Sequence, residues 1–272
     1  MAPRVKRWLG LGSSPAVGVQ ITNEGAFIAL VRPDGPTVVG LGRVALPPGA
    51  VVDGQIRRPT EVGRSIDEAL SAIHWNETPL LHLVVDPVPW MGVDQPGVVP
   101  APVYELLADG TERETGVVAA AEQVVASTVA AAEPVRGTVR SVEPAPVAVA
   151  RLLRLGRTSA GPHFARFSQG GNRWTLCDAD GSLDVEVTHH PSVLATLVDG
   201  PDPAHLETTQ WGSLQLDRRV RAASPLPGQH AAAAGAALGS FGLRPTANLL
   251  GPAATAHLSA GPFGHWTMER VR

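Results

Sequence analysis

The chain has 272 residues, of which 44% are hydrophobic and 17% charged, and its formal net charge is −3. A chain of this length can form one large domain or two modest ones, and its near-neutral charge argues against a nucleic-acid-binding surface. The single cysteine, Cys177, excludes an intramolecular disulfide framework and favours a reduced, cytoplasmic environment. No run of 18 apolar residues occurs, which argues against a membrane-spanning helix.

The first part of the chain predicts a basic, flexible start followed by an α/β unit. Residues 1–13 carry a small basic cluster and are expected to be flexible. The runs VGVQI, AFIALV and TVVGLGRVAL lie within 17–46, separated by NEG and RPDGP turns, and predict a three-stranded meander. A helix is predicted from Thr60 because apolar residues recur there on one helical face: Val62, Ile66, Ala69, Leu70 and Ile73. LLHLVVDP (80–87) predicts a buried strand.

The second part predicts a further α/β unit. Residues 88–103 have the composition of a loop, 115–134 predict a strand entering an alanine-rich helix, and 137–144 predict another strand. A helix is predicted over 146–156, with Pro near its start and Gly at its end. Beyond 162, HFARFS and RWTLCDADGSLDVEV predict paired strands with a hairpin turn at DADG, and HPSVLATLVDG predicts a helix.

Residues 228–242, GQHAAAAGAALGSFG, predict a helix that lies very close to a neighbouring backbone. Ala231, Gly235 and Gly239 are four residues apart on one face. A glycine inside a helix costs about 1 kcal/mol relative to alanine. Two such glycines therefore indicate a position where no side chain fits.

The motif search predicts no catalytic residues and no metal site. Lys6 is the only lysine and no GxxxxGK sequence occurs, which excludes a Walker A loop. GLGRVA (40–45) is not followed by a helix, as a dinucleotide fingerprint requires. His189 and His190 are adjacent, so on a strand they point to opposite faces and cannot chelate one metal together. Asp178 and Asp180 are explained by the hairpin turn.

One combination of segments resembles a known family. VGVQIT (17–22), followed by VALPPGAVVDGQIRRPTEVGRSIDEAL (44–70), is similar to the start of PilM-type proteins, which are actin-like components of type IV pilus assembly machines. The phrase LPPGAVVDGQIRRP (46–59) is its most specific part. The resemblance covers most of 14–243, is looser after 160, and identifies the chain as a divergent, shortened member.

The resemblance implies a two-lobed α/β fold of the actin-like (ribonuclease H-like) type with reduced subdomain insertions. Lobe I is expected at 14–156 with a reduced inserted subdomain, and lobe II at 157–243 with the alanine- and glycine-rich closing helix. Residues 244–272 are expected to be a C-terminal extension.

The resemblance also bears on nucleotide binding, because each lobe of the family has a phosphate-binding hairpin that usually carries an Asp. At the first hairpin that Asp matches Gln20, and the turn that follows includes Thr22 and Asn23. The second hairpin matches ARFSQGG (165–171), which contains no carboxylate; its turn positions are Ser168, Gly170 and Gly171. Without these acids we expect neither ATP nor Mg²⁺ as a cofactor and no ATPase activity, although SQGGN could cradle an anion through backbone N–H groups.

The partner that the resemblance implies is a PilN-like inner-membrane protein, bound through its cytoplasmic N-terminal peptide. The motif of that peptide resembles Ile-Asn-Leu-Leu-Pro, and this chain carries ANLLGP at 247–252. Asn248, Leu249 and Leu250 are therefore a candidate mimic of the partner motif, occupying the chain's own or a neighbour's peptide groove. The alternative is a loop or short turn that contains Asn-Leu-Leu by chance.

The expected function is a PilM-like pseudo-ATPase scaffold of a type IV pilus or related secretion machine. It would be cytoplasmic, held at the inner face of the cytoplasmic membrane by its partner, and able to self-associate. The alternative is an actin-like ATP-dependent phosphotransferase or nucleotide-regulated ATPase. That alternative needs a carboxylate base and a magnesium site, neither of which the sequence locates.

Overall fold

A computed structural model gives the structure of this protein. It describes residues 14–32, 36–52, 54–72, 78–85, 96–106, 111–156, 163–169, 172–179, 182–189, 196–200, 213–214, 221–222, 226–244 and 246–251. The predicted flexible start at 1–13 lies outside these residues, as does most of the predicted C-terminal extension.

The chain alternates strands and helices, as the sequence predicts for an α/β protein. The elements up to the fourth strand of the main sheet are β1 (Ala16–Thr22), β2 (Gly25–Val31), β3 (Thr37–Val44), β4 (Val51–Val52), β5 (Gln55–Ile56), α2 (Pro59–Ser71) and β6 (Leu80–Val85). The next are β7 (Val98–Leu106), β8 (Glu112–Ala121), α3 (Glu122–Ala132), β9 (Thr138–Pro144) and α4 (Ala145–Gly156). The remainder are β10 (His163–Gln169), β11 (Asn172–Ala179), β12 (Ser182–His189), β13 (Thr196–Gly200), β14 (Ser213–Leu214), β15 (Arg221–Ala222), β16 (Leu226–Pro227), η2 (Gly228–His230), α5 (Ala231–Leu238) and η3 (Gly239–Phe241).

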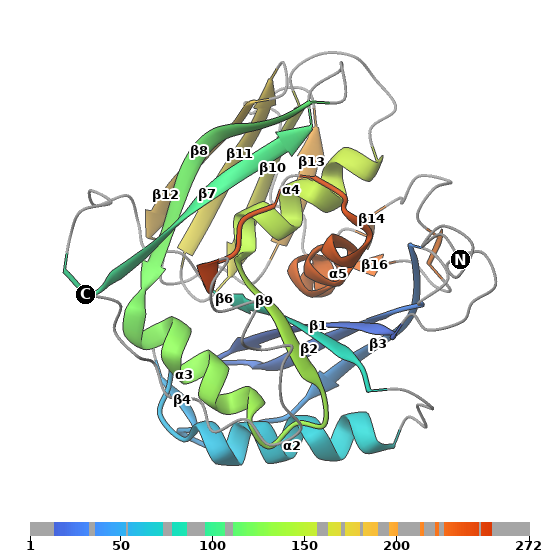
Figure 1. Ribbon diagram of the computed structural model, residues 1–272, viewed down its shortest axis with the longest axis vertical. Helices are drawn as coiled ribbons and strands as arrows, with labels where there is room; N and C mark the ends of the chain where they lie inside the picture. Colours follow the sequence, from blue (N-terminus) through green and yellow to red (C-terminus); the bar gives the residue numbers. More distant parts are fainter. Residues whose placement is uncertain are drawn as a thin grey trace, which may run out of the picture.

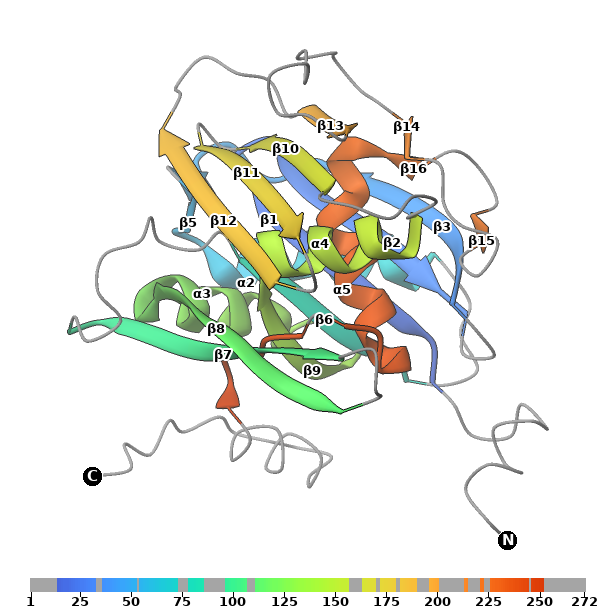
Figure 2. The same cartoon turned by 90° about the horizontal axis from the view of Figure 1, so that it is seen from above.

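A six-stranded main sheet organises the molecule, in the order β15-β3-β2-β1-β6-β9. Strands β1, β2 and β3 form the predicted antiparallel meander, and β6 and β9 extend it in parallel with β1. A second, four-stranded antiparallel sheet has the order β12-β11-β10-β13, and β7 pairs with β8 as a separate ribbon. Helices α2 and α3 cover one face of the main sheet, while α4 and α5 lie between its other face and the second sheet (Figures 1 and 2).

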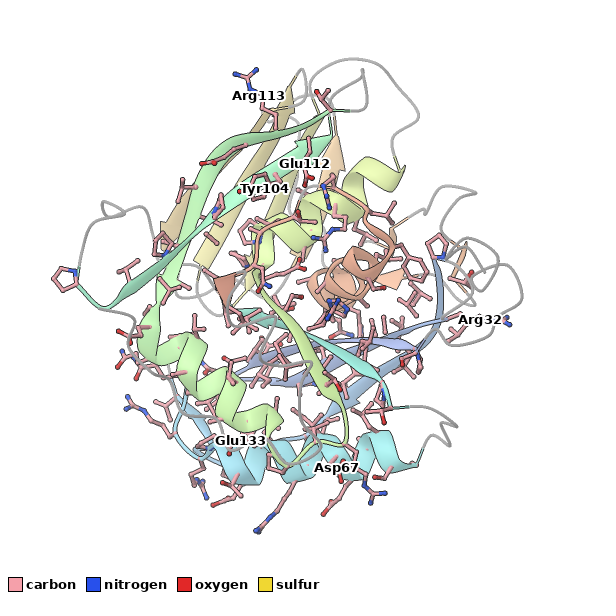
Figure 3. The ribbon with its side chains drawn as sticks, in the orientation of Figure 1. Arg32, Asp67, Tyr104, Glu112, Arg113 and Glu133 are labelled. Atoms are coloured by element: carbon pink, nitrogen blue, oxygen red, sulfur yellow. The ribbon has the colours of Figure 1, made fainter. Side chains whose placement is uncertain are left out.

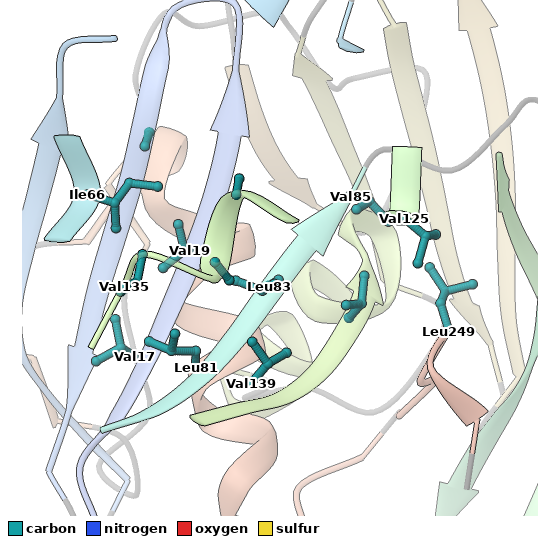
Figure 4. Packing of buried hydrophobic residues seen from close by; sticks show 14 of the residues in the cluster. Val17, Val19, Ile66, Leu81, Leu83, Val85, Val125, Val135, Val139 and Leu249 are labelled. Carbon is teal, nitrogen blue, oxygen red and sulfur yellow. The ribbon is translucent and has the colours of Figure 1, made fainter. Parts of the chain in front are cut away.

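The central strands of the main sheet, β1, β2 and β6, are buried on both faces, and their residues alternate between two clusters of core residues. Val17 and Val19 of β1 lie in the cluster on the α2/α3 side, together with Leu81 and Leu83 of β6 (Figure 4). Ala16 of the same β1 strand lies in the second cluster, with α4 and α5. Burial on both faces explains why these strands are continuous apolar runs in the sequence.

Helix α5 confirms the close backbone approach that its glycines predict. All eight residues of α5 are buried. A Cβ placed on Gly235 would lie 1.9 Å from the carbonyl oxygen of Ala148 in α4, and one on Gly18 of β1 would lie 1.8 Å from that of Ala233. Only glycine fits at these two positions, because a backbone atom cannot move aside as a flexible side chain can.

Two sequence-based expectations are wrong. Residues 98–103 were expected in a loop and lie in β7, where Pro100 and Pro102 pair with β8 and, among the described strands, with no other. Proline has no N–H group to donate to a second neighbouring strand. It is therefore tolerated in a strand that is paired on one side. Residues 196–200 were expected to be helical and form β13, which pairs antiparallel with β10. The DADG hairpin between β11 and β12 is confirmed.

The boundary predicted at 156/157 stays a prediction. Helix α4 connects β9 of the main sheet to β10 of the second sheet, and its end at Gly156 coincides with that boundary. Helix α5, however, packs on the main sheet and on α4, although it was assigned to the second lobe. Within the described residues, no helix is long and apolar enough to cross a membrane.

Candidate functional site

The β1–β2 hairpin carries the first predicted phosphate-binding positions. Thr22 pairs with Gly25 across a two-residue turn formed by Asn23 and Glu24. The Thr22 hydroxyl accepts a hydrogen bond from the Glu24 N–H at 3.1 Å and donates one to the Gly25 carbonyl at 3.2 Å. Gly25 has φ 139°, which side chains rarely permit. The turn is therefore closed by its own polar groups.

Two neighbouring parts of the chain, the turn between β4 and β5 and strand β3, also bind this hairpin turn. The Asn23 side-chain oxygen accepts a hydrogen bond from the Gly54 N–H at 3.1 Å. The Arg43 guanidinium donates to the Glu24 carbonyl at 2.7 Å. Of the two residues that the resemblance places at a phosphate, Thr22 therefore bonds within the turn and Asn23 bonds to the backbone between β4 and β5.

Gln20 occupies the position where the resemblance expects an acid. It is 1% exposed and pairs with Phe27 of β2. It is two residues beyond Gly18 on β1, so both point toward the face of the main sheet that α5 covers. A carboxamide at this place can form hydrogen bonds but brings no negative charge to the site.

The β10–β11 hairpin, predicted as the second phosphate position, is confirmed as a hairpin. Gln169 pairs with Asn172, and Ser168 lies one residue earlier on β10. Gly170 and Gly171 lie outside the described residues. Any anion-binding role of this turn stays a prediction.

A buried carboxylate that the sequence reasoning missed lies on the same face as Gln20. Gln20 of β1 and Glu143 of β9 both pair with Val84 of β6, so the three residues form one row across the main sheet. Glu143 is 4% exposed and forms an ion pair with Arg151 of α4, with 2.8 Å between Oε2 and Nη2. The signal in the sequence is a Glu next to the end of β9, followed eight residues later by Arg151, one of two arginines in an otherwise apolar helix.

The carboxylate of Glu143 is held from its other side by a short polar chain. The Ser141 hydroxyl donates to Glu143 Oε1 at 3.1 Å, and His82 Nδ1 lies 2.9 Å from the Ser141 oxygen. Since the Ser141 proton is used on Glu143, Nδ1 of His82 must carry the proton in this second bond. Its Nε2 is then an acceptor, and it has no hydrogen-bond partner within the described residues.

Burial and the neighbouring arginines shift the pKa values of Glu143 and His82. Burial raises the pKa of the Glu143 carboxyl, while the charge and hydrogen bonds of Arg151 and the Ser141 hydroxyl lower it. Burial, followed by the charges of Arg151 and Arg140, lowers the pKa of His82 to about 3, so the imidazole is neutral near pH 7. The Glu143 carboxylate therefore has two partners, an ion pair with Arg151 and a hydrogen bond from the Ser141 hydroxyl.

Arg151 also binds the end of α5 and the chain beyond it. Its Nη1 donates to the Gly235 carbonyl at 2.6 Å, and its Nε donates to the Leu243 carbonyl at 3.0 Å. Arg151 is fully buried, so one side chain joins β9, α4, α5 and the start of the C-terminal residues. Within the described residues, no group of three or more His, Cys, Asp or Glu side chains could hold a metal ion.

The predicted partner-motif mimic lies in residues 246–251, which we call the C-terminal segment. Its first residue, Thr246, forms an antiparallel bridge with Tyr104 of β7, with hydrogen bonds of 2.9 and 3.0 Å in the two directions. Arg244, just before the segment, forms an ion pair with Glu112 of β8. Figure 3 labels Tyr104 and Glu112 on the β7–β8 ribbon.

The other end of the C-terminal segment is bound to β9. The Asn248 side-chain oxygen accepts hydrogen bonds from the N–H groups of Val142 and Leu250, each at 3.1 Å. The Leu249 N–H donates to the Val142 carbonyl at 2.9 Å. Leu249 is 4% exposed and lies in the core cluster that also contains Val125 of α3 (Figure 4). The segment thus joins the edge of the main sheet to the β7–β8 ribbon.

Comparisons with known proteins identify a likeness in fold. No protein-family model and no curated protein matches the chain. Among solved structures, it is similar to one described as the PilM-PilN type IV pilus biogenesis complex, with a TM-score of 0.52 and 17% sequence identity. The match covers 65% of this chain and 62% of that chain, so this chain spans less than two thirds of the neighbour's length.

A second similar structure is a Bacteroides thetaiotaomicron protein of unknown function described as having an actin-like ATPase fold. Its TM-score is 0.36 and its identity 6%, over 70% of this chain and 73% of that one, which is too distant to support an argument. The likeness to the PilM-PilN structure confirms the predicted resemblance to PilM at the level of fold. This chain has a reduced actin-like α/β fold.

Proposed function

We propose that this chain is a PilM-like cytoplasmic scaffold of a type IV pilus assembly machine or a related secretion machine. The observation that carries this proposal is the likeness in fold to the PilM-PilN complex. The family phrase LPPGAVVDGQIRRP (46–59) supports it independently, because that phrase comes from the sequence and not from the fold.

The proposed mechanism is binding without ATP hydrolysis. A magnesium ion in a nucleotide site needs oxygen ligands that are free to approach it, and carboxylates are its usual protein ligands. Gln20 supplies an amide in place of the acid, and the turn residues Thr22 and Asn23 make their hydrogen bonds inside the protein. The carboxylate in the same row, Glu143, is engaged by Arg151. These contacts support a pseudo-ATPase.

The proposed partner is a PilN-like inner-membrane protein that presents its cytoplasmic N-terminal peptide. Such a partner would hold this chain at the inner face of the cytoplasmic membrane. The neighbouring structure contains both PilM and PilN, which supports a partner of this kind. We also propose that the chain self-associates, and that Asn248, Leu249 and Leu250 mimic the partner motif.

A pull-down with the full chain as bait, from the cells that produce it, tests the scaffold role. The expected result is recovery of an inner-membrane protein with a single membrane span and a short cytoplasmic N-terminus. The purification tag alone serves as the control bait. Repeated capture of no such protein would overturn the proposal.

The alternative, an ATP-dependent phosphotransferase or nucleotide-regulated ATPase, is favoured by the two retained hairpins. A thermal-shift measurement with Mg-ATP separates the two functions, because any ligand that binds only the native state raises its apparent stability. At a concentration 100 times the Kd the gain is about 2.7 kcal/mol. We expect no shift for the native chain or for Gln20→Asp. A saturable shift of the native chain would favour the alternative.

A further inference from the structure

The junction between β7 and β9 presents four backbone groups to one short stretch of chain. The N–H and carbonyl of Tyr104 bond to Thr246, and the N–H and carbonyl of Val142 bond to Asn248 and Leu249. Strand β9 is the edge of the main sheet, and β7 belongs to a separate ribbon. Among the described residues, neither strand has another strand on this side, and the C-terminal segment takes that place.

The two groups of Val142, which is fully buried, require an occupant, whereas Tyr104 is 38% exposed and its groups can also bind water. Buried backbone N–H and carbonyl groups are almost always paired, and leaving one unpaired without water costs a few kcal/mol. The occupant must supply a short extended backbone for Tyr104, a side-chain acceptor for the Val142 N–H, and an apolar side chain for the core. Thr246, Asn248 and Leu249 supply these three in order.

The C-terminal segment is anchored firmly at the residue Leu243 before it, and several of its own residues are partly exposed. Arg151 binds the Leu243 carbonyl from the interior and anchors the chain immediately before the segment. Beyond that point Arg244 is 25% exposed and its partner Glu112 is 46% exposed, so their ion pair contributes little. Thr246 and Asn248 are only partly buried. Ala247 and Leu249 lie in the core cluster and Leu250 packs against it, so these three apolar contacts must be lost if the segment leaves.

We propose that the C-terminal segment is an intramolecular occupant of a peptide-binding site at the β7/β9 junction, and that it blocks this site to peptides from other chains. The outside occupant is an extended peptide with Asn followed by Leu, and its assignment to the inner-membrane partner rests on the proposed function. A tethered segment competes at an effective concentration of about a millimolar, so an outside peptide of equal intrinsic affinity binds the intact chain weakly.

The test uses a fluorescent synthetic peptide of residues 244–252 (RPTANLLGP) and three full-length chains: native, Asn248→Ala and Asn248→Asp. Alanine removes the acceptor for the Val142 and Leu250 N–H groups, whereas aspartate keeps an acceptor oxygen at the same distance from the backbone. We expect Asn248→Ala to bind the peptide at least tenfold more tightly than the native chain, with Asn248→Asp between them. An unlabelled peptide carrying the same Asn-to-Ala change should compete at least tenfold less well than the native peptide.

Equal affinity for the three chains, or binding to none, would overturn the proposal and leave the segment as a permanent part of the core. A second measurement uses the native chain alone, so it does not depend on the variants folding. The amide of Val142 should exchange its hydrogen faster than the amide of Leu83, which pairs with Val142 from inside the sheet. Equal, slow exchange of the two amides would also overturn the proposal.

This outcome is separable from that of the proposed function. If the peptide fails to bind while the pull-down recovers an inner-membrane protein, the blocked site is wrong and the scaffold stands. If the peptide binds as expected while the pull-down recovers none, the site stands and the scaffold role fails.

Discussion

The two faces of the main sheet are built from the same strands but differ in chemistry. Toward α2 and α3 the strands present branched apolar side chains, such as Val19 and Leu83. Toward α4 and α5 the alternate positions include Gly18, His82 and Glu143. The first face contributes ordinary hydrophobic stabilisation. The second fixes the positions of α4, α5 and the chain after α5 through close backbone contact and one buried charge pair.

The difference teaches where a change in sequence matters most. A well-packed apolar face tolerates the loss of a methyl group with a modest cost, because neighbours partly relax. A face that depends on missing Cβ atoms and a paired buried charge has no such tolerance, because backbone atoms and unpaired charges cannot be accommodated cheaply.

The largest expected effect comes from breaking the buried ion pair. Arg151→Met should lower the free energy of unfolding by about 3–5 kcal/mol, because Glu143 is left buried without its partner. Urea unfolding followed by circular dichroism measures the loss. The double variant Glu143→Leu/Arg151→Met should recover much of it. If the single variant is as stable as the native chain, the ion pair does not hold α4 and α5 on the main sheet.

The next effect comes from adding one methyl group to α5. Gly235→Ala should destabilise the protein by about 1–3 kcal/mol, because the new Cβ would lie 1.9 Å from the Ala148 carbonyl oxygen. Alanine has the better helix propensity, worth about 1 kcal/mol, and this gain offsets part of the destabilisation. The steric cost is therefore larger than the measured loss of stability. Thermal and urea unfolding should agree on the sign. A gain in stability would show that α4 and α5 can separate freely.

The polar face should also respond to acid. The pKa of His82 falls from 6.5 to about 3 on folding, so between these values the unfolded chain binds a proton that the folded chain does not. Stability from this group is present above pH 6.5 and is lost as the pH falls toward 3, at up to about 1.4 kcal/mol per pH unit. The loss from pH 6.5 to 5 should be about 1.6 kcal/mol. His230, whose pKa burial also lowers, acts in the same direction, so the measurement is the difference between the native chain and His82→Gln. Parallel pH profiles for the two would contradict the assignment.

The smallest effect is expected on the apolar face. Ile66→Val on α2 removes one methylene group from the cluster with Val19 and should cost about 0.5–1.5 kcal/mol. Urea unfolding at pH 7 and pH 5 should give the same difference from the native chain, since no titrating group is involved. A pH-dependent difference would mean that the two faces are not independent.

The parts of the fold that follow from neighbouring residues were predictable. Turn residues and strand periodicity predict the β1–β2 and β11–β12 hairpins, and the spacing of Val62, Ile66 and Leu70 predicts α2. Strands β7 and β13 were missed because pairing with β8 and β10 makes them strands, and their own local sequence patterns do not indicate this. The prolines of β7 give it the composition of a loop.

The candidate site divides in the same way. Gln20, Thr22 and Asn23 were found from the sequence because the resemblance to PilM-type proteins aligns them with a phosphate-binding hairpin, and the structure adds that the turn residues bond within the protein. Glu143 was missed because its importance depends on Arg151, which reaches it only after α4 folds back.

The sequence by itself determines the alternation of strands and helices, the absence of a Walker A loop, and the need for close contact along α5, because these depend on residue type and local spacing. Tertiary structure alone decides that Arg151 neutralises Glu143, that His82 is neutral, buried and bonded to Ser141, and that Asn248 and Leu249 occupy the β7/β9 junction. The physical reason is distance along the chain. Most of these contacts join residues tens to more than a hundred positions apart, and no local pattern specifies which distant backbone will be within reach.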